Sequence, residues 1–391
     1  MKPHMPLVIY IFSLCAFSLG FTEFVSIGLV SVIALDLQIG VAAVGTAVTA
    51  YAAGVVIGAP ILTALTTHWP RKRLLLLTML LFSITNLAVG FSPDLLRILS
   101  ARFISGLAHG VFFAVASGAA IELVEKKRAG AAISLVFGGL TIAMALAVPL
   151  GTYLGSLFPW RFIFMAIAVF GGIGVLGLMR YMPDIQAIKT SSIRSNLHAL
   201  INPQLLIGAS VTMLAYCGAF SLYTYISPLL LQVTQISVVN LSIMLLIYGC
   251  AAAVGNVLGG KMTDYFGVER ACLFIMIGLA LVLFMIGLFA HFIIITAFLI
   301  ALLGGLSYAA VPALQTRLIR LAQHYEPESI TVIAGLNIAG FNLGLTLGSL
   351  IGGATILLTG NVLLTAFVGT FIVIIGIVVL IKHDNAQKSR L

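Results

Sequence analysis

Charged side chains are scarce in this chain. Asp, Glu, Lys and Arg make up 8% of its 391 residues, whereas hydrophobic residues make up 61%. A soluble domain carries roughly 25% charged residues, so the composition excludes an ordinary soluble fold. The mean hydropathy of +1.19 predicts a polytopic membrane protein built from α-helices.

Residues that bind metals or perform covalent catalysis are few and scattered. The seven histidines form no metal template and no nucleophile–base cluster, which argues against a membrane-embedded enzyme. The sequence also lacks the G-x-x-x-x-G-K-[ST] loop of an ATP-driven pump. We therefore expect no metal and no enzymatic activity. The cysteines all fall in apolar stretches and are interpreted as small packing residues: Cys15, Cys217, Cys250 and Cys272.

About a dozen apolar stretches, each close to 20 residues long, run through the chain. This is the length that an α-helix needs to cross a bilayer core of roughly 30 Å. The first stretch is too long for the core of a signal peptide. The predicted spans are 8–33, 41–65, 74–92, 95–122, 130–157, 161–182, 205–232, 239–260, 271–290, 292–316, 330–353 and 361–381.

Basic residues alternate from one side of the membrane to the other. All 20 Lys and Arg residues except Arg97, Arg102 and Arg161 fall in alternate connections or in the two tails. Because Lys and Arg near helix ends resist translocation, those connections and both termini are expected to face the cytoplasm. The net charge of +9 is thus interpreted as a topology signal that also contacts anionic lipid headgroups, not as a nucleic-acid surface.

The chain divides into two halves of six spans each. The longest stretch without an apolar run is 183–204, which predicts helical bundles over 1–182 and 205–391 joined by a cytoplasmic linker. The halves resemble copies, since 63–72 corresponds to 260–270 and Gly106 to Gly305. Two such repeats around a central path are typical of secondary transporters, which bind their substrate near the midplane.

Four segments carry a family resemblance that covers essentially the whole chain. They are Thr22–Phe24 with Gly28, Ala50–Gly54 with Gly58–Pro60, Arg102 with His109–Phe113, and Leu222–Pro228. With them the chain resembles the major facilitator superfamily, within its twelve-span drug:proton antiporter branch, and is similar to bacterial sugar-efflux and purine-efflux members. The resemblance implies an all-α fold of twelve transmembrane helices in two pseudo-symmetric halves.

The resemblance also implies a function. The expected activity is proton-coupled export of a small organic solute across the bacterial inner membrane, by a monomer that needs no cofactor besides the proton gradient. Drugs, sugars and purine-like compounds remain open as substrates. A receptor-like membrane protein that transports nothing is a further alternative.

A cytoplasmic gating motif of this superfamily is nearly complete after the eighth span, at Gly260, Asp264, Gly267 and Arg270. Its first-half copy is degraded, with Thr67 at the Asp position and Pro70 at the second Gly position. Asp264 is expected to reach a helix N-terminus or a base such as Arg71. This contact would hold the halves together on the inside.

The antiporter motif of the fifth span is partial. Pro149 is present, Gly151 and Gly155 follow, but Val148 replaces the Gly that normally precedes the Pro. This departure leaves a proton symporter for uptake as the alternative to antiport. The small residues favour close helix contact. In the resembling fold this contact is made with the opposite half, and simple packing is the other interpretation.

Glu23 and Arg102 are the charged residues expected deep in the spans. Both are predicted to lie roughly 10–15 Å below the outer surface, at 1.5 Å per helical residue. A charge at this depth costs about 2.5–3.5 kcal/mol on insertion scales, so it faces a cavity or a partner. We expect Glu23 to be the protonatable coupling group and Arg102 to bias its titration. A static structural ion pair is the alternative.

His109 lies two turns beyond Arg102 on the same helix face. It is either a proton relay or a hydrogen-bonded packing residue. In the second half Ala301 aligns with Arg102 and Tyr308 with His109, which predicts proton handling in the first half. Small-molecule pockets combine apolar walls with a few polar groups, and the residues that fit are Tyr51, Tyr216, Phe220, Tyr223, Asn337 and Asn342. Anchoring of tyrosines at the membrane interface is the competing interpretation.

Overall fold

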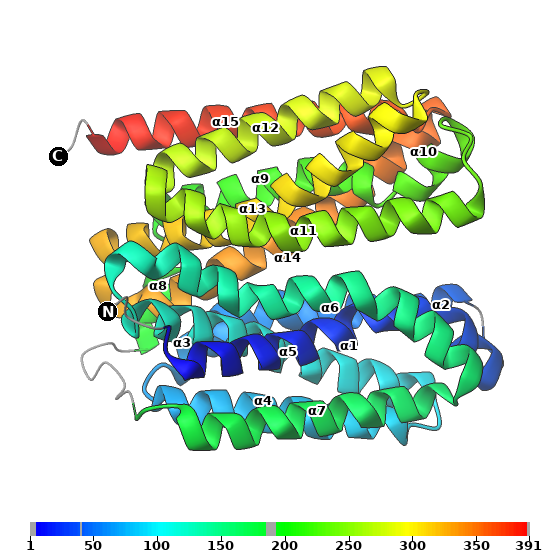
Figure 1. Ribbon diagram of the computed structural model, residues 1–391. Coiled ribbons are helices and arrows are strands. Elements are labelled where there is room, and N and C mark those ends of the chain that lie inside the picture. The colour runs from blue at the N-terminus through cyan, green and yellow to red at the C-terminus, as the bar shows by residue number, and fades with distance from the viewer. Residues whose placement is uncertain (1–4, 40, 185–192, 389–391) are drawn as a thin grey trace. The chain divides into compact units, whose positions relative to one another are not determined.

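The computed structural model describes residues 5–39, 41–184 and 193–388 (Figure 1). Within these ranges the chain forms helices and turns and no strand. Twelve helical segments are long and apolar enough to cross a membrane, which confirms the all-α polytopic fold. Lys2, Lys189 and Arg390 lie outside the described residues, as does part of the predicted linker 183–204.

The first half contains six long helices or helix runs that lie side by side (Figure 1). The second of them is interrupted by a π-helical turn, η1, at Pro60. The elements are α1 (Leu7–Leu37), α2 (Val41–Ile57), η1 (Gly58–Leu62), α3 (Thr63–Thr66), α4 (Arg71–Gly90), α5 (Leu95–Glu122), η2 (Lys126–Arg128), α6 (Ala129–Leu157), α7 (Trp160–Tyr181) and the short α8 (Ile193–Ala199).

The second half repeats this order. Its first span consists of two helices in succession, and the eighth and ninth spans meet at a single glycine, Gly267. The elements are α9 (Pro203–Tyr223), α10 (Ile226–Gln232), α11 (Val238–Phe266), α12 (Val268–Phe289), α13 (Ile293–Tyr325), η3 (Pro327–Ser329), α14 (Ile330–Thr359) and α15 (Leu364–Lys388).

Local sequence signals set several helix boundaries. Asp94 caps α5 by accepting a hydrogen bond from the backbone N–H of Arg97, and Asn202 caps α9 in the same way, with Pro203 at the first helical position. Gly267 separates α11 from α12 with φ 84° and ψ 156°, a region that only glycine adopts readily. The second Gly of the gating motif is therefore required by the backbone.

Packing groups the residues into two compact units. Unit 1 contains Met1–Ile201 together with Ala322–Ala339, and unit 2 contains Asn202–Leu321 together with Gly340–Leu391. The boundary near residue 201 falls inside the predicted linker 183–204. The segment 322–339, which belongs to the second half in sequence, packs on the first half. There, a Cβ added to Gly335 would collide with the backbone of Ala59.

Glycines of the fifth and eleventh spans bring helices together mainly within their own halves. A Cβ on Gly151 would lie 2.6 Å from Val25, and one on Gly155 would lie 2.6 Å from Leu29, both on α1. In unit 2, Gly344 and Gly348 of α14 pack against the backbone of α9. Gly151 and Gly155 therefore bring α6 close to α1 of the same half, as the interpretation of simple packing expects. Pro149 lies in α6, and its side chain is outside what the structure describes.

Candidate functional site

A buried arginine organises the polar interior of unit 1. Arg102, on α5, is 1% exposed. Its Nη1 donates to the backbone oxygen of Thr22 at 3.0 Å and to the Thr22 hydroxyl at 3.1 Å. Its guanidinium carbon lies 4.2 Å from the centroid of the Tyr51 ring, an arrangement that adds cation–π attraction. The side chain is thereby fixed between α1 and α2.

Glu23 is adjacent in sequence to this anchor but does not form an ion pair with Arg102 among the described residues. Glu23 is half-buried on α1 and interacts with Arg102 only through its electrostatic field. In this structure Thr22 and Tyr51 hold the guanidinium, and not the carboxylate that the alternative of a static ion pair requires. Among the described residues the Nε and Nη2 groups of Arg102 have no hydrogen-bond partner, so they can donate to a carboxylate or to a solute oxygen.

Tyr51 and His109 form the second part of the same cluster. The Tyr51 hydroxyl lies 2.7 Å from Nδ1 of His109 and donates to the backbone oxygen of Leu19 at 3.2 Å. His109 is 4% exposed, and its ring packs 4.7 Å from that of Phe113. The structure thus brings together Arg102, Tyr51 and His109, although Tyr51 was expected to contact substrate and not to bridge the two basic side chains.

Asn86 and Ser105 extend the cluster and were not predicted from the sequence. The Thr22 hydroxyl donates to Oδ1 of Asn86 at 2.5 Å, and Nδ2 of Asn86 reaches the Ser105 hydroxyl at 3.4 Å. Asn86 lies on α4 and is 1% exposed. An amide inside an apolar span is costly without partners. An Asn inside a predicted apolar span is therefore the sequence feature that could have identified Asn86.

The other predicted substrate residues are divided between the units. Unit 2 contains Tyr216, Phe220, Tyr223 and Asn342, whereas Asn337 belongs to unit 1. The Tyr216 hydroxyl donates to the backbone oxygen of Ser307 at 3.0 Å. Phe220 lies against Tyr223 with ring centroids 5.3 Å apart, and Tyr223 stacks on Tyr248 at 4.2 Å. The tyrosines of α9 therefore form an aromatic cluster in the interior of unit 2, and Tyr248 is a member that sequence reasoning missed.

The gating residues occupy the end of each unit that carries the basic side chains, here called the basic end. In unit 1, Arg71 is buried and forms an ion pair with Glu122 at the end of α5. Glu122 is thus the ion-pair partner of Arg71 in unit 1. Gly260 is buried near the end of α11, Asp264 is half-buried one turn later, and Arg270 is exposed at the start of α12.

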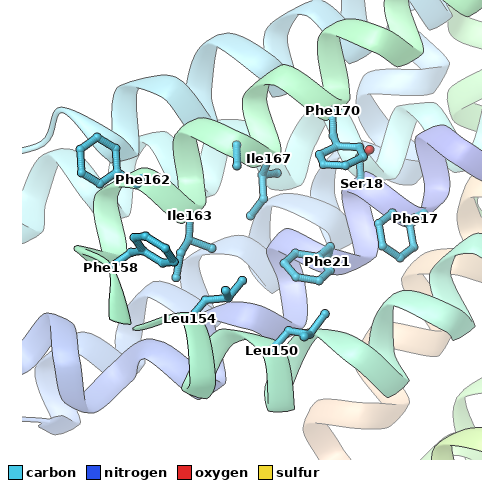
Figure 2. A pocket seen from close by; sticks show the side chains of 11 residues that line it. Phe17, Ser18, Phe21, Leu150, Leu154, Phe158, Phe162, Ile163, Ile167 and Phe170 are labelled. Atoms are coloured by element: carbon cyan, nitrogen blue, oxygen red, sulfur yellow. The ribbon is translucent and has the colours of Figure 1, made fainter. Parts of the chain in front are cut away.

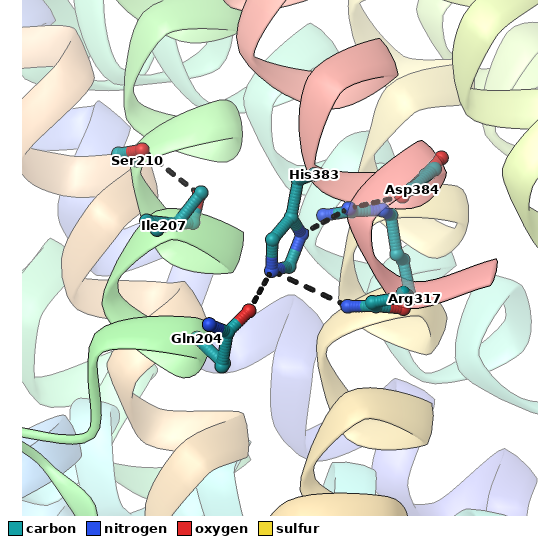
Figure 3. Close-up of polar contacts among 7 residues, drawn as sticks. Gln204, Ile207, Ser210, Arg317, His383 and Asp384 are labelled. Atoms are coloured by element: carbon teal, nitrogen blue, oxygen red, sulfur yellow. Dashed lines mark hydrogen bonds and ion pairs between the residues drawn. The ribbon is translucent and has the colours of Figure 1, made fainter. Parts of the chain in front are cut away.

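A second charged cluster lies at the basic end of unit 2 (Figure 3). Arg317 donates from Nη2 to Asp384 at 2.6 Å and lies 2.9 Å from Nδ1 of His383. Nε2 of His383 lies 3.0 Å from Oε1 of Gln204. Arg317 and His383 are 3% and 5% exposed. The start of the C-terminal tail, which was interpreted as a topology anchor, is therefore an integral part of the bundle.

An apolar pocket of about 350 Å³ lies between α1, α6 and α7, and no charged side chain is among its described lining residues (Figure 2). Aromatic side chains spaced four residues apart line it, such as Phe17 and Phe21 on α1, and Phe158 at the end of α6 with Phe162 in the first turn of α7. Ser18 is its polar member, and the Ser18 hydroxyl already donates to the backbone oxygen of Leu14. This pocket accommodates hydrocarbon and offers no group for proton transfer.

Comparison with known proteins places these features in a family. A model of the Major Facilitator Superfamily matches residues 12–324 and 208–391. The chain belongs to the Major Facilitator Superfamily. A Bacillus subtilis relative described as an uncharacterized MFS-type transporter, YtbD, is 37% identical over 100% of this chain and 98% of its own length. The chain is thus a multi-pass membrane transporter, and this relative is described as a transporter.

Other relatives carry more specific names. The inner membrane transport protein YdhP of Escherichia coli is 35% identical over 91% of this chain and 90% of its own. A probable sugar efflux transporter of Helicobacter acinonychis is 31% identical over 89% and 88%. Among solved structures, the human organic anion transporter MFSD10 covers 96% of this chain and 98% of its own, with a TM-score of 0.75 and 16% identity. That likeness establishes the shared fold.

Proposed function

We propose that this superfamily member is a proton-coupled exporter of a small organic solute in the bacterial inner membrane. The basic end faces the cytoplasm, since Lys and Arg concentrate on the inner side of membrane proteins. Inner-membrane location and export are supported by the names of YdhP and of the sugar efflux relative. The protein works as a monomer and uses the proton gradient in place of a cofactor.

The observation that carries this proposal is the buried Arg102 beside Glu23. Ionisable groups inside membrane spans are costly and mark ion pathways. Among the described residues, two guanidinium nitrogens of Arg102 have no hydrogen-bond partner, so Arg102 can donate further hydrogen bonds. Glu23 is the acidic group next to its anchor Thr22. A carboxyl and a guanidinium that meet in one conformation and separate in another provide the differential interaction that coupling requires.

We assign the described conformation to the proton-loaded step of the proposed cycle. Arg102 is bound to Thr22, and among the described residues Glu23 has no ion pair that would stabilise a negative charge in the membrane. The segment 322–339 meanwhile covers the basic end of the first half. When that end opens, Arg102 turns toward Glu23, and the proton leaves on the cytoplasmic side. His109, hydrogen-bonded to Tyr51 below Arg102, lies on the path of that proton.

The solute binds through the aromatic side chains of the second half. Tyr216, Phe220, Tyr223 and Tyr248 provide ring faces and hydroxyl groups but no charge. Such a surface suits flat, amphipathic or hydroxylated molecules. This chemistry keeps drugs, sugars and purine-like compounds as the substrate classes.

Proton symport for uptake is the second candidate. It is favoured by one observation, the replacement by Val148 of the Gly that precedes Pro149 in the antiporter motif. Antiport and symport share the Glu23 chemistry and differ in whether the proton and the solute move in opposite directions.

A proteoliposome experiment tests the proposal. An imposed pH gradient is challenged with sugars, purines and cationic drugs, using the wild type and Glu23→Gln. A solute that dissipates the gradient through the wild type but not through Glu23→Gln identifies the coupled substrate. Reversing the gradient distinguishes export from uptake. Equal dissipation by both proteins, at equal protein levels, would overturn the coupling role of Glu23.

A further inference from the structure

Asn196 joins three segments that are far apart in the sequence. It lies on the short helix α8 and is fully buried, at 0% exposure. Its Nδ2 donates to the Thr67 hydroxyl at 2.6 Å, and its Oδ1 accepts from the Ser329 hydroxyl at 2.8 Å. Thr67 follows α3 at the end of the second span, and Ser329 ends η3 just before the eleventh span. One amide therefore bridges the first half, the linker and the second half.

Thr67, one end of this bridge, lies at a position of the gating motif. Thr67 occupies the Asp position in the degraded first-half copy of the gating motif, where a carboxylate is missing. The motif's nearby base, Arg71, forms its ion pair with Glu122, which lies in the same half and so cannot link the halves. The remaining polar connection from the Thr67 position runs through Asn196.

The segment that Asn196 holds is fitted closely onto the first half. Two turns beyond Ser329, Gly335 meets the backbone of Ala59 in the π-helical turn η1, with its hydrogen facing Ala114. Between them, Thr331 lies against Gly118 of α5. These are close contacts between helices of the first half and the segment. They are also made of small residues, which can separate and meet again without rearranging large side chains.

We propose that Asn196 is the latch that keeps the basic end closed, through its hydrogen bonds to Thr67 and Ser329. The inference rests on the alternating access of the proposed function and assigns the closing step to the linker helix. Opening breaks both hydrogen bonds and exposes a buried amide. The net free energy of these two hydrogen bonds therefore favours the closed conformation over the open one. The linker helix α8 thereby makes the closing contact that a carboxylate at position 67 would otherwise make.

Cysteine labelling measures the latch without any substrate or proton gradient. The reporter is Ala114→Cys, whose side chain is covered by Gly335 when the segment is docked. The internal control is the native Cys15, which is 0% exposed and lies between α1, α4 and α7. The other three cysteines are replaced by Ser. Maleimide labelling at both sites is followed by mass spectrometry in proteoliposomes.

Asn196→Ala is expected to raise the labelling rate at Ala114→Cys by about 5- to 30-fold, the change in equilibrium that the loss of one or two net hydrogen bonds produces. Labelling of Cys15 stays unchanged, because the bundle itself is intact. The matched control is His198→Ala, an exposed residue on the same helix, which leaves both rates unchanged. Equal rises at both sites, or no rise at either, would overturn the latch.

Two further measurements guard against a reporter that disturbs the segment. Hydrogen exchange of the peptide 327–339 needs no cysteine and should accelerate in Asn196→Ala but not in His198→Ala. Thr67→Val and Ser329→Ala should each reproduce part of the effect and be non-additive with Asn196→Ala; full additivity contradicts a shared network. Because none of these readouts involves transport, a failure of proton coupling leaves them unaffected.

Discussion

The two halves of the transporter use one packing plan with two kinds of chemistry. In the first half, a Cβ on Gly106 of α5 would collide with the backbone oxygen of Tyr51 on α2. In the second half, a Cβ on Gly304 of α13 would collide with the backbone oxygen of Tyr248 on α11. Each half thus places the backbone oxygen of a second-span tyrosine against a fourth-span glycine, although Gly304 lies one residue before Gly305, the residue that aligns with Gly106.

The surroundings of these tyrosines differ. Tyr51 lies under the Arg102 guanidinium and binds His109, whereas Tyr248 stacks on Tyr223. The aligned positions in the second half are Ala301 and Tyr308, which carry no charge. Both halves bring a second-span tyrosine against a fourth-span glycine, but basic side chains surround the tyrosine of the first half and an aromatic ring stacks on that of the second. We therefore expect equivalent glycine changes to have equal effects and equivalent polar changes to have unequal effects.

The largest difference is expected between the basic ends of the two units. The side chains of Arg317 and Asp384 are 4% and 16% exposed, while those of Arg71 and Glu122 are 6% and 40% exposed. Removing one partner of a buried pair costs about 3–5 kcal/mol, so Asp384→Asn should lower the free energy of unfolding by about 3 kcal/mol. Glu122→Gln should cost about 1 kcal/mol or less, because solvent screens that carboxylate.

Denaturant unfolding in detergent measures both changes. The exposed Lys382 next to this cluster gives the control, and Lys382→Ala should leave the unfolding midpoint unchanged. Equal losses from Asp384→Asn and Glu122→Gln would show that burial does not distinguish the two basic ends.

Replacing Arg102 by Lys tests the chemistry of the first half. Lys keeps the charge but not the planar fork that reaches Thr22 and stacks on Tyr51. Hydrogen bonds to charged groups are worth about 1.5–3 kcal/mol each, so Arg102→Lys should slow proton-coupled transport about 100-fold. Arg97→Lys, on the exposed part of the same helix, is the matched control. Wild-type transport by Arg102→Lys would mean that positive charge alone suffices.

Sequence reasoning identified the fold because hydropathy and basic residues act along the chain. The twelve spans follow from one-dimensional patterns, and the division into halves and the common depth of Glu23 and Arg102 are further predictions from the same patterns. The partners of Arg102 did not, because Thr22 and Tyr51 become neighbours of α5 only through packing between helices. Asn196 was missed for the same reason. It stands beside residues 185–192, in a stretch without a strong apolar pattern, and only Thr67 and Ser329 give it a role.

At the C-terminal tail, composition alone does not predict which residues are buried. Lys382, His383 and Asp384 form a polar run that is typical of an exposed anchor, and exposed Lys382 fits that interpretation. His383 and Asp384 are instead turned onto Arg317 by the helical period of α15. Such an outcome depends on which face of the helix meets α13, which a short polar run does not specify.

Adding a methyl group to the paired glycines tests the shared packing plan. Gly106→Ala and Gly304→Ala each force a side-chain carbon against a tyrosine carbonyl, and overpacking of this kind costs about 1–3 kcal/mol. The two losses in unfolding free energy should be equal within about 0.5 kcal/mol. Gly172→Ala, where no atom lies within 4 Å of the added carbon, is the control. A large loss in one half alone would contradict a common backbone design.

The smallest effect is expected at the end of unit 1 opposite the basic end. There Asp36 accepts hydrogen bonds from Arg161 and Trp160, and these bonds lower the pKa of Asp36 below its usual value. A carboxyl group whose pKa is lowered by folding contributes stability above its unfolded pKa of about 3.9 and loses it as the pH falls through the folded value.

Asp36→Asn should therefore reduce the free energy of unfolding at pH 7 by about 0.2–1 kcal/mol, the range of a partly exposed ion pair. The difference from the wild type should shrink as the pH falls below about 4. Unfolding midpoints between pH 3 and pH 7 measure it. The sixth span of the second half, which opens with Leu364 and Thr365 where the first has Trp160 and Arg161, offers no such bond. Thr365→Ala should accordingly lower the free energy of unfolding by an amount that does not vary with pH. If the loss for Asp36→Asn were also independent of pH, the proposed electrostatic difference between the sixth spans of the two halves would be wrong.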